Sequence, residues 1–345
     1  MGFGAAQGVN AKCRAMYARL LDRSDYDVLL SMKSVSQIAD YLKKQTPYAY
    51  VLRRVNENDV HRGQLEQVFK KSLYYDYERL LKFTTGSYKE AIRAMFESYE
   101  IEDLKLVIGS ICSDHKHILA ADDLTYVRTY SNFPISALLD ADTMEDLVAN
   151  LPHTRYYKPL LPFAVKENPD FMKIDHALNL LNYKSKMSVF KNTLRGAGRK
   201  IAVSLYGTQA DVENILFIYR IKKLYNFQTS EILQQLIPCE YKIGKKELLA
   251  LAECGGLEEL IGKIAATSYE PLFPRGRESE WEMIHAEYFY RIHRKNLRLH
   301  GADIGVALSY LYQKEIDIKN IVMILEGIRY SLPTEKIAKF LIGYQ

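Results

Sequence analysis

Apolar residues recur along this chain mostly at intervals of three and four positions and rarely alternate, which predicts helices rather than strands. Three similar stretches stand out, each with a leucine pair followed by two apolar residues spaced four apart. A four-residue spacing places both side chains on one helix face. The pattern therefore predicts two short helices at each of three places. The leucine pairs are Leu29/Leu30, Leu138/Leu139 and Leu248/Leu249, and the spaced residues are Ile38/Leu42, Leu147/Leu151 and Leu260/Ile264.

Each stretch ends in a Thr-x-Tyr triplet with a large apolar residue four positions after the Tyr. A threonine hydroxyl can accept a hydrogen bond from a backbone N–H that opens a helix. In the third stretch Glu270 completes the Thr-x-x-Glu pattern of a capping box. We interpret the triplets as helix caps and packed corners rather than ligand sites. They are Thr46/Tyr48 in TPYAYVL, Thr154/Tyr156 in TRYYKPL and Thr267/Tyr269 in TSYEPLF.

A second motif occurs once after each triplet and consists of an acid, an apolar residue, Glu or Lys, Asp or Asn, and Leu or Ile. The three copies are EIEDL at 100–104, DVENI at 211–215 and DIKNI at 317–321, and apolar residues follow each copy. An acid in the first turn of a helix interacts favourably with the helix dipole. The motif therefore predicts the start of a helix in all three copies.

The spacing of these motifs predicts an internal repeat that fills the chain. The triplets recur at intervals of about 110 residues, longer than the roughly 33 to 47 residues of common helical repeats. Each copy is long enough to form a small bundle with its own core. We expect an all-α fold of three helical repeats, at residues 1–117, 118–225 and 226–345.

Composition supports a folded chain with a substantial core, because 48% of its 345 residues are hydrophobic. The net charge of +5 is weak evidence for nucleic-acid binding, which we do not expect. The cysteines form no C-x-x-C pair, and the N-terminal residues lack the apolar core of a signal peptide. A cytosolic protein with reduced thiols is expected. No apolar run approaches the roughly 20 residues of a membrane-spanning helix, so we expect no insertion into the bilayer.

No constellation of reactive residues predicts catalysis. GFGAAQG at 2–8 lacks the spacing of a dinucleotide-binding loop. His285 and His293 lie eight positions apart, too far to share a metal without another element, and no H-E-x-x-H motif includes them. His300, His115 and His117 likewise have no partner pattern. We expect no catalytic, cofactor-binding or metal-binding residues and no cofactor.

The aromatic clusters leave two interpretations open. Stacking platforms for a ligand are one, but at helical spacing such residues more often pack in a core. The tyrosine-rich helices leave one alternative function open, that of a helical scaffold or a nucleic-acid-binding protein. The residues are Tyr74, Tyr75, Tyr77, Tyr288, Phe289 and Tyr290.

The chain resembles a central-stalk component of rotary vacuolar-type and archaeal-type ATPases, known as the C subunit in bacteria and archaea and as the d subunit in eukaryotes. Ala49 stands where eukaryotic-type relatives usually carry Gly, and Asp103 replaces the Asn of the other two motif copies. We therefore expect a bacterial or archaeal complex. The resemblance extends over the whole chain and is most specific at Arg14, Leu20, Leu21, Asp25, Tyr26, Leu29, Leu42, Thr46, Tyr48 and Leu52.

The resemblance implies a funnel of three bundles with pseudo-threefold symmetry and no active site of its own. Such a protein is a socket that couples the rotor shaft, made of the D and F subunits, to the membrane ring of proteolipid subunits, for ion transport or ATP synthesis. It lies peripherally on the cytoplasmic face of the membrane. Basic residues flank the three triplets and form a candidate interface with the ring. They are Arg53, Arg54, Arg155, Lys158, Arg275 and Arg277.

Overall fold

The computed structural model describes residues 3–56, 62–113, 119–131, 133–165, 169–225, 227–298 and 303–344. These residues form helices joined by turns and contain no strand, so the expected all-α class is confirmed. The first nine helices are α1 Phe3–Tyr17, α2 Arg23–Ser31, α3 Val35–Gln45, α4 Ala49–Leu52, α5 Arg62–Phe83, α6 Gly86–Phe96, α7 Ser98–Ile111, α8 Thr125–Tyr130 and α9 Ile135–Leu139. The others are α10 Met144–Ala149, α11 Tyr157–Ala164, α12 Phe171–Thr193, α13 Gly196–Leu224, α14 Thr229–Gln234, α15 Lys245–Ala252, α16 Leu257–Ile264, η1 Glu270–Leu272, η2 Glu278–Glu280, α17 Trp281–Arg298, α18 Gly305–Arg329 and α19 Thr334–Ala338.

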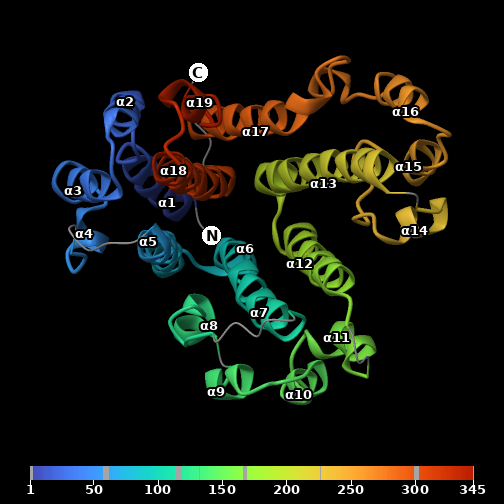
Figure 1. The fold of residues 1–345 in the computed structure, drawn as a ribbon, viewed down its shortest axis with the longest axis horizontal. Coiled ribbons are helices and arrows are strands. Elements are labelled where there is room, and N and C mark those ends of the chain that lie inside the picture. The colour runs from blue at the N-terminus through green and yellow to red at the C-terminus, as the bar shows by residue number, and fades with distance from the viewer. Residues whose placement is uncertain are drawn as a thin grey trace.

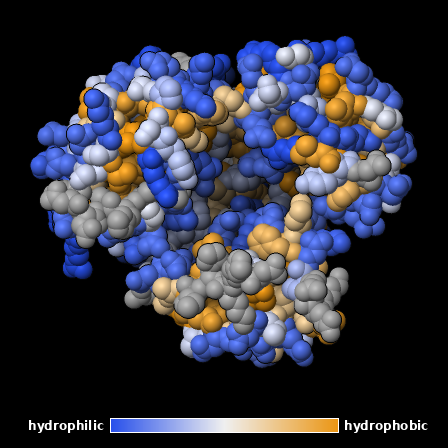
Figure 2. Space-filling view, in the orientation of Figure 1, coloured by the Kyte–Doolittle hydropathy of each residue, from blue (hydrophilic) through white to orange (hydrophobic). Residues whose placement is uncertain are grey.

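The helices form three groups around a central space (Figure 1). The N–C group contains α1–α5 together with α18 and α19, the middle group contains α7–α11, and the third group contains α13–α16 with η1. Helix α6 packs against α12, and α12 packs against α13, so these helices connect the groups. The surface is hollowed where the three groups meet (Figure 2).

Each group has a buried apolar cluster. The cluster of the N–C group combines residues of 9–96 with residues of 297–341, so both ends of the chain share one core; it also includes Tyr126, Phe190, Leu194 and Ala202. The middle cluster lies within 101–178 and the third within 212–289. These clusters describe packing, and the division of the chain at 117 and 225 stays a prediction.

The predicted pairs of short helices are confirmed at all three places. They are α2 and α3, α9 and α10, and α15 and α16. Leu29, Leu138 and Leu248 are buried, as their positions on the apolar face require. Each pair leads directly into one of the Thr-x-Tyr turns.

The prediction that the acidic motif starts a helix is right for one copy and wrong for two. Glu100 lies in the first turn of α7, but Asp211 and Asp317 lie in the middle of α13 and α18. The difference arises at Glu97, which ends α6 and also caps α7. No such break precedes Asp211 or Asp317, so those helices continue upstream through the motif.

The predicted capping box of Glu270 is also wrong. Helix η1 begins at Glu270 itself, its N-cap is Tyr269, and no side chain caps it. The threonines instead end the preceding segment and shape the turn. Helix α11 runs for eight residues although its third residue is Pro159.

Candidate functional site

The three Thr-x-Tyr turns share one local geometry. In each turn the threonine Oγ1 accepts a hydrogen bond of 3.2 Å from the tyrosine N–H two residues later. The same hydroxyl donates back to a carbonyl of the preceding segment, at 2.7, 2.9 and 2.7 Å in chain order. The hydroxyl therefore tightens the turn and directs the tyrosine inward. The tyrosines Tyr48, Tyr156 and Tyr269 are all buried.

Each of these tyrosines donates a hydrogen bond to the first acid of one copy of the acidic motif. We call these three contacts the acid–tyrosine joints. They are Tyr156 to Glu100 at 2.8 Å, Tyr269 to Asp211 at 2.8 Å, and Tyr48 to Asp317 at 2.6 Å. The motif of one stretch therefore pairs with the triplet of the next, and the last motif pairs with the first triplet.

The fourth motif position holds the backbone of a later segment in every copy. Asn214 exchanges two hydrogen bonds with the backbone of Ile237, at 2.9 and 2.7 Å. Asn320 does the same with Ile342, at 2.9 and 3.0 Å. Asp103 cannot donate, and its carboxylate instead accepts from the N–H groups of residues 126 and 127 at 2.8 and 2.9 Å. This position therefore clamps a later piece of backbone against each motif helix.

Burial dominates the electrostatics of the joints. It raises the pKa of Asp211 and of Asp317, although tyrosine hydroxyls that donate to these carboxylates oppose the shift. Burial also raises the pKa of Tyr48 well above its ordinary value, and the nearby Asp317 charge adds to that shift. The acid and the tyrosine of each joint are paired with one another, which indicates a structural role.

The two described histidines of α17 are core residues. His285 Nε2 lies 2.8 Å from the carbonyl oxygen of Leu272, and burial lowers the pKa of His285 to about 4. His293 Nδ1 lies 3.0 Å from the hydroxyl of Ser309, and burial lowers its pKa to about 3. His115, His117 and His300 lie outside the described residues. Within the described ranges, no cluster of three His, Cys, Asp or Glu side chains is placed to hold a metal ion.

Five of the six basic residues of the candidate interface are exposed, and they lie beside the Thr-x-Tyr turns. In Figure 1, α4, α11 and the segment that follows α16 lie at the outer side of their groups, away from the central space. Arg277 forms an ion pair with Glu280 at 2.5 Å. The exposed residues are Arg53, Arg54, Lys158, Arg275 and Arg277.

Arg155 differs from the other five because it lies partly buried within the middle group. Its Nη1 forms an ion pair of 3.0 Å with Glu97, and its Nη2 donates to the hydroxyl of Tyr156 at 2.8 Å. Arg155 therefore supports the acid–tyrosine joint of the middle group. The ion pair does not follow from the sequence, since Glu97 and Arg155 are 58 positions apart.

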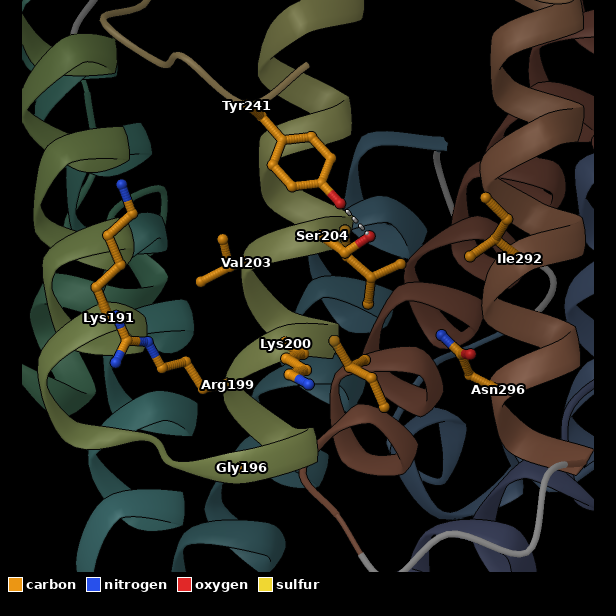
Figure 3. A pocket seen from close by; sticks show the side chains of 11 residues that line it. Lys191, Gly196, Arg199, Lys200, Val203, Ser204, Tyr241, Ile292 and Asn296 are labelled. Carbon is orange, nitrogen blue, oxygen red and sulfur yellow. Dashed lines mark hydrogen bonds between the residues drawn. The ribbon is translucent and has the colours of Figure 1, made fainter. Parts of the chain in front are cut away.

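A groove of about 840 Å³ lies between α13 and α17. Figure 3 shows Lys191 and Arg199 on one side of it and Ile292 and Asn296 of α17 on the other. At its upper end the hydroxyl of Tyr241 donates to Ser204 at 3.0 Å. The lining contains three basic residues and no acid, and the rest of it is largely apolar. The basic residues are Lys191, Arg199 and Lys200, and the apolar ones are Ile201, Val203, Leu205 and Ile292. Such a groove suits contact with an acidic surface better than chemistry.

A second hollow, of about 700 Å³, lies between α12 and α13. Burial lowers the pKa of Lys186 in this hollow to about 8, even though the side chain is only partly covered. The acid Glu213 lines the same hollow and attracts Lys186 electrostatically. The protein atoms around Lys186 thus reduce the hydration of its ammonium although the hollow stays open to solvent, as expected for a concave surface.

The sequence model of the ATP synthase (C/AC39) subunit family matches residues 9–340. The chain belongs to this family. Three archaeal members are each named as the C subunit of an A-type ATP synthase. The one from Methanocaldococcus jannaschii is 22% identical over 97% of this chain and 86% of its own length. Those from Methanosarcina mazei and Pyrococcus abyssi are each 23% identical, over 96% and 97% of this chain and 91% and 89% of their own lengths.

The family match extends across all three groups of helices. Among the described residues of this family member, no helix is long and apolar enough to cross a membrane.

Proposed function

We propose that this chain is a non-catalytic rotor subunit of an archaeal-type or vacuolar-type rotary ATPase, a socket that couples the D and F shaft subunits to the membrane proteolipid ring. The observation that carries this proposal is the family match over residues 9–340, which leaves almost none of the chain for another function. The relatives that share nearly the whole length bear the name of an A-type ATP synthase subunit. In this function the chain is peripheral, on the cytoplasmic face of the membrane.

Three groups of helices around a hollow are suited to this function, because a socket must surround its shaft (Figures 1 and 2). A coupling protein must also be stiff, since a soft socket would absorb rotation rather than transmit it. The acid–tyrosine joints supply stiffness because each joins elements from different parts of the chain through buried polar contacts. The joint between Tyr48 and Asp317 also ties the two ends of the chain together.

The exposed basic residues beside the three turns are proposed as contacts with the ring. They lie beside structurally similar turns in each group, so a partner with several similar subunits could engage all of them. Electrostatic contacts of this kind set orientation and association rate more than affinity. Arg155 contributes indirectly, by holding the turn that presents Lys158.

Co-purification tests the assembly. The full chain should bind the purified D and F subunits, and should restore binding of a soluble ATPase head to ring-containing membranes from which this chain has been removed. Failure of both would contradict the proposal. A salt-dependent gel shift with random RNA, without binding to D and F, would support the nucleic-acid-binding alternative instead.

Charge reversal tests the proposed ring contacts. The triple variant R53E, K158E and R275E alters one exposed residue beside each turn. Its matched control, K71E, K184E and K246E, reverses three exposed lysines elsewhere. We expect the first variant to weaken membrane-ring binding at low salt while retaining binding to D and F, and the control to behave as wild type. Equal binding by both variants would exclude the basic residues as ring contacts.

A further inference from the structure

The N–C group contains a cavity that the proposed function does not use. It has a volume of about 430 Å³ and lies between the end of α1, the Thr46 turn, α5 and α18. Lys314 of α18 lies in its wall, with its ammonium 3.8 Å from the centre of the Tyr48 ring. Arg19 and Arg79 also line it, and both are exposed. The size is within the range of small-molecule sites.

Lys314 is only 5% exposed, and among the described residues its ammonium has no hydrogen-bond or ion-pair partner. The acids nearest to it are already engaged. The carboxylate of Asp317 accepts hydrogen bonds from the hydroxyl groups of Tyr26 at 2.5 Å and Tyr48 at 2.6 Å. A buried cation that has only an aromatic ring as a direct contact is poorly compensated.

The middle group has an acid at the position that corresponds to Lys314. Three residues before Glu100 the chain has Glu97, whereas three residues before Asp317 it has Lys314. Beside the middle joint a cavity of about 460 Å³ is lined by Glu97 and Arg155, which form an ion pair of 3.0 Å. In the N–C group Pro47 replaces that arginine. Asp317 and Asp76 attract Lys314 electrostatically, but among the described residues neither forms a direct ion pair with its ammonium.

The remaining charges of the cavity are balanced except for one. Asp76 accepts from Tyr310 at 2.6 Å and pairs with Arg79 at 3.6 Å. Glu78 pairs with Lys82 at 3.5 Å. Arg19, by contrast, has no partner among the described residues. The two unpaired groups of the cavity are thus both cations, one buried and one at the mouth.

We propose that this cavity binds a small oxyanion, either a carboxylate or a phosphate, between Lys314 and Arg19. The ammonium and guanidinium groups are the donors that such anions require. The exposed rings of Tyr50 and Tyr75 at the mouth, 6.3 Å apart, would cover an attached organic group.

Titration calorimetry of the full chain tests the site, with inorganic phosphate and N-acetylaspartate as the two probes and sodium chloride at equal ionic strength as the reference. We expect saturable one-site binding of at least one probe. Tighter binding of phosphate would identify a phosphate ligand, and tighter binding of N-acetylaspartate a carboxylate. The absence of saturable binding by either probe would overturn the proposal.

Three variants locate the binding. K314M should lower affinity about tenfold or more, and R19Q, which alters an exposed side chain, should lower it less. The control K184M should bind as wild type. The double variant P47R/K314E places the Glu–Arg pair of the middle group in this cavity, so it should fold and lose binding. Unchanged affinity in both K314M and R19Q would show that the anion binds elsewhere and would overturn the proposal.

Discussion

The hydroxyl of Tyr48 donates a hydrogen bond of 2.6 Å to the carboxylate of Asp317, although 269 positions separate the two residues. Both side chains are buried, and Tyr26 donates to the other oxygen of the same carboxylate. This contact fixes α18 against the first of the three Thr-x-Tyr turns. It makes the two ends of the chain parts of one core, which no separate N-terminal or C-terminal piece could form alone.

Replacing Tyr48 with Phe tests the strength of this joint. We expect Y48F to lower the free energy of unfolding by about 1–3 kcal/mol, because Asp317 stays buried but loses one of its two tyrosine donors. The ring itself is retained, so packing changes little. Urea unfolding followed by circular dichroism measures the effect. The control Y330F alters a hydroxyl on a side chain that is 66% exposed and should leave stability unchanged; equal effects in both variants would show that the hydrogen bond contributes nothing.

Replacing Asn320 with Ala tests the clamp on the C-terminal segment. The side chain exchanges two hydrogen bonds with the backbone of Ile342, so N320A leaves that donor and acceptor without their partner. We expect a loss of about 1–3 kcal/mol and faster amide hydrogen exchange around Ile342. Hydrogen-exchange mass spectrometry provides the local measurement. The neighbouring variant K319A, at an exposed position of the same helix, should exchange as wild type. Unchanged protection in N320A would contradict the assigned clamp.

Asp103 should make stability depend on pH. Burial raises its pKa to about 6, above the ordinary 3.8, and the two backbone N–H groups that donate hydrogen bonds to its carboxylate only partly offset this rise. Between pH 4 and 6 the folded chain binds more protons at Asp103 than the unfolded chain, so this residue's contribution to stability falls as pH rises. The variant D103N should remove this dependence. Relative to D103N, the wild type should lose up to about 3 kcal/mol across this window.

Urea unfolding at pH 4 and pH 7 measures the Asp103 effect. The amide should be tolerated, since Asn occupies the corresponding position at 214 and 320. The control D140N, at an exposed position, should retain the pH dependence of the wild type. If D103N and the wild type change in parallel between the two pH values, Asp103 does not carry a raised pKa.

Two glycines inside helices should respond in opposite directions to Ala. A Cβ at Gly207 of α13 would lie 2.6 Å from Cγ and 2.8 Å from Cβ of Tyr241, atoms too near the backbone to move freely. G207A should therefore lower stability by about 1–3 kcal/mol. At Gly8 of α1 nothing lies within 4 Å of such a Cβ, so G8A should raise stability by up to about 1 kcal/mol through helix propensity. Thermal unfolding of both variants checks the contrast; a loss of stability in both would point to a general intolerance of alanine.

The site was only partly predictable. The threonines, tyrosines and acids of the joints were all recognisable as repeated motifs, but not as each other's partners. One sequence signal could have paired them: the Thr-x-Tyr triplet and the acidic motif each occur three times. The clamp positions also recur in sequence, yet their partners near residues 126, 237 and 342 share no common motif. Nothing in the sequence separates Arg155 from the exposed basic residues, because its ion-pair partner Glu97 lies 58 positions away.

Local structure followed from the order of the residues alone: the short helix pairs, the three turns and the all-α class. Apolar spacing and turn chemistry act over a few residues, so they can be read directly from the chain. Packing in three dimensions was needed to establish that Asp211 and Asp317 lie within long helices, that each acid pairs with the tyrosine of another stretch, and that both ends of the chain share one core. These outcomes depend on which surfaces are buried together, and burial joins residues such as Tyr48 and Asp317 that no local rule connects.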